Sequence, residues 1–201
     1  IYISANHYAY TKISQKVMEI LKNSSPNVEV YSIDEAFVDF TGLTKLYKKN
    51  YYKIAYDLQQ KILNEVDIPV TIGVSKTKTL AKLASDKAKN TSSRIALIGK
   101  SSIQTLLKYT DIQEVWGIGR KLGTKLRGLG VRSGLDYINK DDNWIKNRFG
   151  KNGLSVKAEL MGIIVSPISN EIELPKSISD TKSFLEFTSD IQFLKNELAI
   201  H

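Results

Sequence analysis

The chain contains no cysteine, which excludes a disulfide framework and thiolate metal ligands and fits a reducing compartment. No apolar run approaches the about 20 residues that cross a bilayer, and no signal-peptide pattern is visible. There are only two histidines, and there is no Ser-His-Asp arrangement, dinucleotide fingerprint or internal repeat. These absences argue against a disulfide-stapled, membrane-spanning or serine-hydrolase protein.

Positive charge is what the sequence has in excess. Its 201 residues carry 29 lysines and arginines against 21 aspartates and glutamates, a net charge of +8. Residues 71–99 hold six basic side chains and one acidic side chain. A basic stretch of this kind is expected where a protein meets a phosphate-bearing partner, and a solvated helix face is the alternative.

The apolar spacing of residues 1–99 predicts an α+β fold. It indicates helices at 11–22, 52–66 and 77–89, and strands at 28–33, 36–40 and 70–74. The first two strands are close enough in sequence to form an antiparallel hairpin. Helices that alternate with a hairpin and a strand are typical of helices packed on a small sheet.

After Gly99 the pattern becomes helical. Residues 100–168 contain short helical segments with glycines and no convincing strand, which predicts a second, all-α module. Residues 169–201 are expected to be a polar linker and the start of a further unit, with a helix at 189–200.

Asp34 and Glu35 stand side by side between the two strands of the predicted hairpin. Within a strand, neighbouring side chains point to opposite faces, whereas at a hairpin tip two adjacent carboxylates can converge. Mg²⁺ prefers oxygen ligands and takes one or two carboxylates together with substrate phosphates. The pair is therefore a candidate metal site, and an exposed acidic turn with no function is the alternative.

Three lysines lie on the polar face of the helix expected at 77–89: Lys78, Lys82 and Lys89. The last two are seven residues apart, which places them about 10 Å apart along one helical face. Ammonium groups so placed can neutralise a triphosphate, although the stretch lacks the GxxxxGK[ST] pattern of a P-loop. The alternative is an amphipathic helix with a solvated face.

The stretch VWGIGRKLGTKLRGLGV, residues 115–131, has the glycine spacing of a helix-hairpin-helix motif. Gly117 and Gly119 permit a tight turn, and the free N–H groups at the start of the following helix can bind an anion. Three basic residues add positive charge beside the turn: Arg120, Lys121 and Lys125. Such a motif holds nucleic-acid backbone without reading bases, and an ordinary helical turn is the alternative.

Taken in order, these stretches resemble a Y-family translesion DNA polymerase. YSIDEAFVDFTG resembles the second carboxylate motif of the family, GVSKTKTLAKLASDKAK its palm lysine helix, and VWGIGRKLGTKL the helix-hairpin-helix of its thumb. Within the family, SANHYAY together with SIDEAFVDFTGL and VWGIG is most similar to the catalytic subunit of bacterial polymerase V, rather than to the polymerase IV branch. The resemblance runs over essentially the whole chain.

The resemblance implies a role for each candidate residue of the first module. Asp34 and Glu35 would be catalytic ligands of two Mg²⁺ ions, with Glu35 on the ion that activates the primer 3′-hydroxyl. Lys82 and Lys89 would face the incoming nucleotide triphosphate. Asp39 also matches the carboxylate motif and is expected to have a structural role.

The same resemblance implies that the chain contains parts of three domains. Residues 1–99 would be a partial palm, 100–168 a helical thumb, and 169–201 a linker and the start of a little-finger domain. The thumb would bind the DNA backbone through Gly117, Gly119 and the three neighbouring basic residues.

The resemblance also implies what this sequence leaves out. The first metal-binding Asp of the family, its fingers and most of its little finger would be absent, so we expect the chain to be truncated at both ends and inactive alone. Its parent would be a DNA-directed DNA polymerase for translesion synthesis in SOS repair, in the bacterial cytoplasm at the nucleoid. The implied partners are primer–template DNA, damaged DNA and dNTPs, with a sliding clamp and the polymerase V accessory subunit in the full-length protein, and no membrane.

Two alternatives remain open on the sequence alone. A non-catalytic DNA-binding remnant would keep salt-dependent, sequence-independent contact with duplex DNA through the helix-hairpin-helix. It would incorporate no nucleotide. A globular protein with no nucleic-acid role would do neither.

Overall fold

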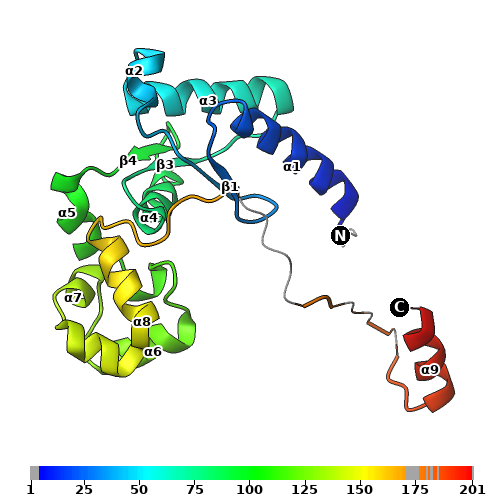
Figure 1. Cartoon of the computed structure of the whole chain (residues 1–201). Coiled ribbons are helices and arrows are strands. Elements are labelled where there is room, and N and C mark those ends of the chain that lie inside the picture. Colours follow the sequence, from blue (N-terminus) through cyan, green and yellow to red (C-terminus); the bar gives the residue numbers. More distant parts are fainter. Residues whose placement is uncertain (1–4, 171–176, 180, 182, 185, 201) are drawn as a thin grey trace. The chain divides into compact units, whose positions relative to one another are not determined.

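The computed structural model describes residues 5–170, 177–179, 181, 183–184 and 186–200. The chain divides into two compact units, Ile1–Asn170 and Glu171–His201. In the larger unit, helices surround two small pairs of strands (Figure 1). Among the helices of the described residues, none is long and apolar enough to span a membrane.

An antiparallel β-hairpin and three helices form the N-terminal part of the larger unit. In chain order these are α1 (His7–Lys22), β1 (Val28–Val30), β2 (Ala36–Val38), α2 (Leu43–Tyr47) and α3 (Tyr51–Val66). The side chains of Asn6 and Asn50 accept hydrogen bonds from the first turns of α1 and α3, which fixes where these helices begin. The apolar faces of both helices share a buried cluster with Val28. The predicted hairpin is confirmed, with Glu29 opposite Phe37.

A parallel β-α-β unit follows, made of β3 (Ile72–Val74), α4 (Lys78–Ala88) and β4 (Ile95–Leu97). Parallel strands need a crossover connection, and α4 provides it. Strand β3 lies directly against α4 because Gly73 has no side chain: a Cβ there would lie 2.1 Å from the carbonyl oxygen of Ala81. The sequence analysis predicted β3 and α4 but missed β4, which is only three residues long.

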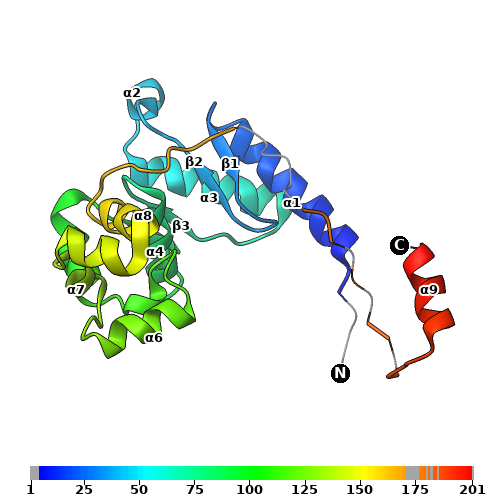
Figure 2. The same cartoon turned by 60° about the horizontal axis from the view of Figure 1, so that its bottom comes forward.

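Helices make up most of the rest of the larger unit, as predicted, and all but α8 are short. In chain order these are η1 (Lys100–Ser102), α5 (Ile103–Lys108), η2 (Ile112–Glu114), α6 (Arg120–Gly128), α7 (Gly134–Ile138) and α8 (Asp142–Leu160), where η denotes a 3₁₀ helix. Helix α8 is kinked at Gly150, whose φ is 65°. In both views, α4 lies between the hairpin and these helices (Figure 1, Figure 2).

The core of the helical part extends into α4. Leu80 and Leu83 of α4 are buried in one cluster with Leu107, Tyr137 and other residues of the later helices. Helix α4 therefore belongs by sequence to the first predicted module and packs with the second. The palm–thumb boundary between residues 99 and 100 stays a prediction.

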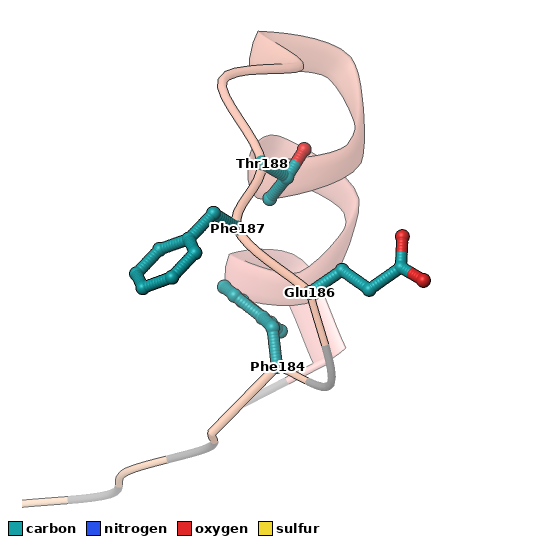
Figure 3. A pocket seen from close by; sticks show the side chains of 4 residues that line it. All are labelled: Phe184, Glu186, Phe187 and Thr188. Carbon is teal, nitrogen blue, oxygen red and sulfur yellow. The ribbon is translucent and has the colours of Figure 1, made fainter.

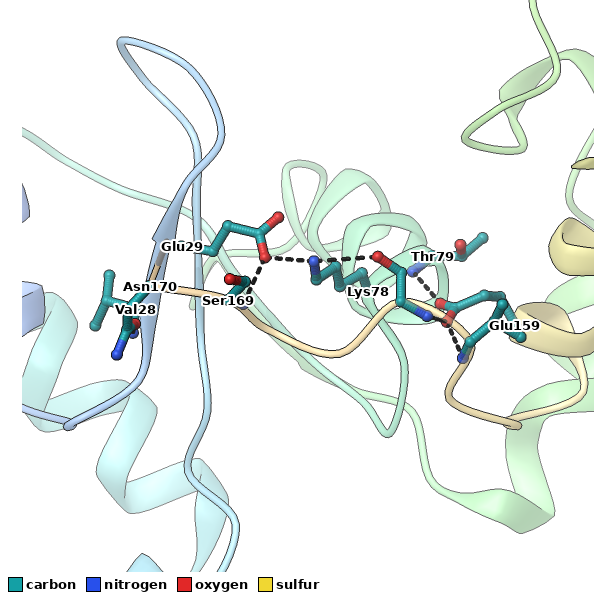
Figure 4. Close-up of polar contacts among 9 residues, drawn as sticks. Val28, Glu29, Lys78, Thr79, Glu159, Ser169 and Asn170 are labelled. Atoms are coloured by element: carbon teal, nitrogen blue, oxygen red, sulfur yellow. Dashed lines mark hydrogen bonds and ion pairs between the residues drawn. The ribbon is translucent and has the colours of Figure 1, made fainter. Parts of the chain in front are cut away.

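Residues 161–170 run back past α4 to the hairpin (Figure 4). At one end, the buried carboxylate of Glu159 accepts hydrogen bonds from three backbone N–H groups, those of Thr79, Val165 and Ser166. At the other end, the side-chain oxygen of Asn170 accepts a hydrogen bond of 2.8 Å from the N–H of Val28. This return segment ties the end of α8 to both α4 and β1.

The described part of the smaller unit contains helix α9 (Ile191–Ile200), as predicted for residues 189–200. The Asp190 carboxylate accepts hydrogen bonds from two N–H groups of its first turn. Four residues line a hollow of about 370 Å³ (Figure 3), namely Phe184, Glu186, Phe187 and Thr188. Much of the linker expected after residue 169 lies outside the described residues, which omit 171–176.

Tyr137 of α7 makes the stability of the larger unit depend on pH in the alkaline range. Its ring is buried, and its hydroxyl donates to the carbonyl of Gly153 at 3.0 Å. Burial raises the pKa of Tyr137 from 10.0 to about 12. The stabilisation from the protonated hydroxyl is therefore complete below pH 10 and is lost as the pH rises to about 12.

We expect Tyr137→Phe to remove this part of the alkaline decline in the free energy of unfolding. Urea denaturation on both sides of the window, near pH 9 and near pH 12, measures the difference between the variant and the native chain. The exposed Tyr109→Phe serves as the matched control and should keep the native decline. Identical pH profiles for Tyr137→Phe and the native chain would contradict the assignment.

Candidate active site

Asp34 and Glu35 lie in the turn that joins β1 to β2, as predicted. The N–H groups of Tyr31 and Ser32 both donate to the carbonyl of Glu35, at 2.9 and 3.0 Å, and close the turn. The exposed Asp34 carboxylate accepts a hydrogen bond from the Ser32 hydroxyl at 2.7 Å. The turn therefore holds the backbone of both acids and leaves the Asp34 carboxylate open to solvent. We call residues 31–35 the carboxylate turn.

Glu35 forms an ion pair with Lys82 of α4. The two residues are 47 positions apart in the chain, so the contact brings the carboxylate turn against the lysine helix. The Glu35 side chain is 42% exposed and the Lys82 side chain 24% exposed. An ion pair in partial contact with water contributes about 1 kcal/mol or less, so either partner can exchange it for another charge.

Lys89 is the C-cap residue of α4, and its ammonium donates to Asp86 at 2.8 Å. The pKa of Lys89 is raised, chiefly by the hydrogen bond and charge of Asp86 and further by the charges of Glu35 and Asp34. Lys89 thus lies within electrostatic range of both acids of the carboxylate turn. Of the lysines predicted on this helical face, Lys82 is the one in direct contact with the paired acids, through Glu35.

Lys78 differs from the sequence prediction. The helical pattern placed it on the exposed face with Lys82 and Lys89, whereas its side chain is only 6% exposed. Its ammonium donates to the Glu29 carboxylate of β1 at 2.5 Å (Figure 4). A lysine is buried only when its charge is paired. That pairing depends on a strand residue 49 positions away, which periodicity does not reveal.

The two carboxylates of the turn fit one side of a magnesium site. Both offer the oxygen ligands that hard cations prefer. In the part of the chain that the structure describes, no group of three or more Asp, Glu, His or Cys side chains could hold a metal ion. Phosphate oxygens and water could supply further ligands to a Mg²⁺ ion held by Asp34 and Glu35.

Asp39 lies just beyond β2, where it accepts local hydrogen bonds that hold the chain in place. Its carboxylate accepts a hydrogen bond of 2.8 Å from the N–H of Thr41, and its carbonyl accepts one from the Ser25 hydroxyl at 2.5 Å. These contacts fix the exit of the hairpin, which is the kind of role expected for Asp39 from the sequence.

The predicted helix-hairpin-helix turn lies between η2 and α6. Gly117 has a φ of 90°, which favours glycine, and a Cβ there would lie 3.1 Å from Val156. Gly119 is the N-cap residue of α6 and has no side chain to occupy the N–H groups of the first turn. The three basic candidates on α6 are exposed: Arg120, Lys121 and Lys125. The structure thus places free N–H groups together with Arg120 and Lys121 at the exposed start of α6, whereas Lys125 lies in its last turn.

An aromatic cluster links the two candidate sites, and the sequence analysis did not find it. The Trp116 ring centroid lies 5.4 Å from that of Tyr31 and 5.5 Å from that of Phe37. The Tyr31 and Phe37 centroids are 5.9 Å apart. No local signal in the sequence identifies these partners, because they lie some 80 residues away from Trp116.

Two family models match this chain. Residues 1–86 match the impB/mucB/samB (IMS) family, and residues 100–131 match the HHH motif of the IMS family. The second match contains the helix-hairpin-helix turn described above. Together the two matches take in more than half of the chain.

Curated relatives match at about one-third identity. Protein UmuC of Salmonella typhimurium is 34% identical over 146 residues, covering 71% of this chain and 34% of the relative. DNA polymerase IV of Streptococcus sanguinis is 33% identical over 201 residues, covering the whole chain and 55% of the relative. The chain spans about half the length of the polymerase IV relatives it matches, and about a third of UmuC.

Solved structures of DNA polymerases share the fold. DinB from Sulfolobus solfataricus has a TM-score of 0.70 at 30% identity, covering 85% of this chain and half of that one. An insertion ternary complex of Dbh DNA polymerase has a TM-score of 0.72 at 30% identity, covering 85% of this chain and 49% of the other.

The chain shares its α+β fold with DNA polymerases of known structure and its helix-hairpin-helix with the IMS family. The chain belongs to the impB/mucB/samB family, the Y family of DNA polymerases. The resemblance inferred from the sequence is thereby confirmed. UmuC and polymerase IV relatives match at nearly equal identity, so the polymerase V branch stays a prediction.

Proposed function

We propose that this chain supplies part of the palm and the thumb of a DNA-directed DNA polymerase for translesion synthesis. The parent protein would transfer a deoxynucleoside monophosphate to a primer 3′-hydroxyl and release pyrophosphate. The observation that carries the proposal is the ion pair between Glu35 and Lys82, because it joins the acids of the carboxylate turn to the lysine helix at one site. Relatives named DNA polymerase IV and UmuC support the proposal.

Asp34 and Glu35 would hold Mg²⁺ in this site. When bound, magnesium supplies Lewis-acid activation of the primer hydroxyl and neutralises charge on the leaving group. The Asp34 carboxylate is ready to bind, because it is exposed and hydrogen-bonded within its own turn. The Glu35 carboxylate must first give up its ion pair with Lys82.

Lys82 and Lys89 would bind the triphosphate. Each ammonium is paired with a carboxylate, Lys82 with Glu35 and Lys89 with Asp86. Phosphate oxygens can replace these partners at low cost, because partly exposed ion pairs are weak. In the transition state, both charges would offset the negative charge that develops on the pyrophosphate leaving group.

The helix-hairpin-helix would hold the DNA backbone. Phosphate oxygens would accept hydrogen bonds from the N–H groups at the start of α6, next to Gly117 and Gly119. Exposed positive charge from Arg120, Lys121 and Lys125 adds a sequence-independent attraction. Contacts of this kind do not depend on the identity of the bases, which suits a damaged template.

We place the parent protein in the bacterial cytoplasm at the nucleoid, in the SOS response to DNA damage. Its partners would be primer–template DNA, damaged DNA and dNTPs. A sliding clamp and the polymerase V accessory subunit would bind the full-length protein. These assignments rest on the family resemblance.

Primer extension tests the proposed function. The chain aligns over its whole length with 55% of the Streptococcus sanguinis polymerase, so it can replace the matching part of that relative in a chimera. We expect the chimera to extend a primed template with dNTPs and Mg²⁺, and to stop when the metal is chelated. A folded chimera that binds duplex DNA but adds no nucleotide would contradict the proposal.

That contrary result would favour the second candidate function, a non-catalytic DNA-binding protein. The exposed basic residues of α6 favour this alternative, because they need no metal to attract DNA. It predicts an affinity for duplex DNA that falls steeply with salt and does not depend on Asp34 or Glu35.

A further inference from the structure

Trp116 lies between the helix-hairpin-helix turn and the carboxylate turn of the larger unit. It directly precedes Gly117, where the left-handed backbone of the helix-hairpin-helix turn begins. Its ring meets Tyr31, whose own N–H donates to the carbonyl of Glu35. Through its contact with Tyr31, the Trp116 side chain therefore connects the helix-hairpin-helix turn, which we also call the DNA-binding turn, to the carboxylate turn.

The packing of Trp116 differs from that of a core residue. Its ring is half-buried and belongs to neither of the two hydrophobic clusters of the larger unit. It contacts Tyr31 at an interplanar angle of 82° and Phe37 at 45°, within the range of favourable aromatic pairs. The contacts of Trp116 thus bridge two parts of the fold, and they do not serve to fill either core.

The hairpin rings of this cluster also touch the lysine helix. The Lys82 ammonium lies 5.9 Å from the centroid of the Tyr31 ring, and the Lys78 ammonium lies 5.6 Å from that of Phe37. At this range, an ammonium group and the face of an aromatic ring attract each other electrostatically. The Tyr31 ring, which contacts Trp116, therefore also contacts the lysine that pairs with Glu35.

We propose that Trp116 is a positioning residue that fixes the DNA-binding turn beside the carboxylate turn. This inference deepens the proposed function and rests on it. A primer held at Gly117 and Gly119 reaches the acids in a reactive arrangement only if the two turns keep a constant separation. Misplacement by about 1 Å costs a reaction of this kind roughly a hundredfold in rate.

A distance measurement on the chain itself tests the proposal. Because the chain has no cysteine, nitroxide labels attach only where cysteines are introduced. Thr41→Cys reports on the hairpin, and Gly128→Cys reports on α6, where an added Cβ would meet nothing within 4 Å. Double electron–electron resonance then gives the distribution of distances between the two labels.

We expect a narrow distribution for native Trp116 and about a doubling of its width in Trp116→Ala. Trp116→Phe keeps an aromatic ring and should restore the narrow distribution. Trp144→Phe is the matched control, since the Trp144 ring packs on Phe149 within the helical part. If Trp116→Ala fails to fold, Trp116→Leu takes its place with the same expectation. A native distribution in the Ala or Leu variant overturns the proposal.

Kinetics of the chimera provide a second readout. Trp116→Ala should lower kcat for extension at least tenfold while changing the affinity for duplex DNA by less than twofold, because the phosphate contacts remain. Extension at the native rate overturns the proposal. A native chimera that adds no nucleotide would overturn the proposed function instead, and the label distances would still decide the role of Trp116.

Discussion

Asp34→Asn lowers the rate of nucleotide addition by the chimera about 10³-fold, equivalent to about 4 kcal/mol of transition-state stabilisation. Asparagine has the shape of aspartate and can still accept the hydrogen bond from Ser32, so the carboxylate turn should keep its structure. What is lost is the negative charge that would bind Mg²⁺ in the proposed site. Single-turnover primer extension at saturating DNA and dNTP measures the effect.

The same chemical change far from the site is the control for this prediction. Asp67 caps α3 in a left-handed conformation, with a φ of 61°, which asparagine tolerates well. Asp67→Asn should therefore extend primers at the native rate. Glu35→Gln should also lose activity, because it removes the second charge of the turn. Native rates in both Asp34→Asn and Glu35→Gln would refute the metal assignment.

Gly73→Ala should have the largest effect on stability, about 3 kcal/mol or more of the free energy of unfolding. The new Cβ would lie 2.1 Å from the carbonyl oxygen of Ala81 and 2.2 Å from the N–H nitrogen of Ser85. Both atoms are backbone atoms, so no side-chain rotation relieves the clash, and β3 must separate from α4. Urea denaturation followed by circular dichroism measures the loss.

Gly99→Ala is the matched control, because a Cβ at Gly99 would meet no atom within 4 Å. It should change the free energy of unfolding by less than about 0.5 kcal/mol. A similarly small change for Gly73→Ala would show that β3 and α4 do not pack as closely as described. Since α4 carries Lys82, the separation should also weaken its contact with Glu35.

Local patterns predicted most elements of the larger unit because the signals lie within each element. Helix α3 shows the four-residue apolar spacing, and the hairpin is recognisable because its strands adjoin one turn. Strand β4 was missed for the opposite reason. It has three residues, and its partner β3 lies across a helix, so nothing nearby in the sequence marks Ile95–Leu97 as a strand.

The candidate site could be predicted residue by residue, but its assembly could not. The sequence indicated the acids of the carboxylate turn and the lysines of α4 separately, whereas their meeting is a tertiary contact between Glu35 and Lys82. Periodicity could not distinguish buried Lys78 from exposed Lys89, because burial depends on the partner Glu29. The contacts of Trp116 likewise required coordinates.

The most direct test of the central claim uses Mn²⁺ in place of Mg²⁺. Because paramagnetic Mn²⁺ broadens nearby amide resonances even when binding is weak, Mn²⁺ with dATP can be titrated into the isotopically labelled chain. The account predicts that resonances of the carboxylate turn, residues 31–35, and of α4 from Lys82 onward broaden first. Asp34→Asn should abolish this pattern. Broadening that is confined to other elements, or that persists unchanged in Asp34→Asn, would contradict a shared metal and nucleotide site.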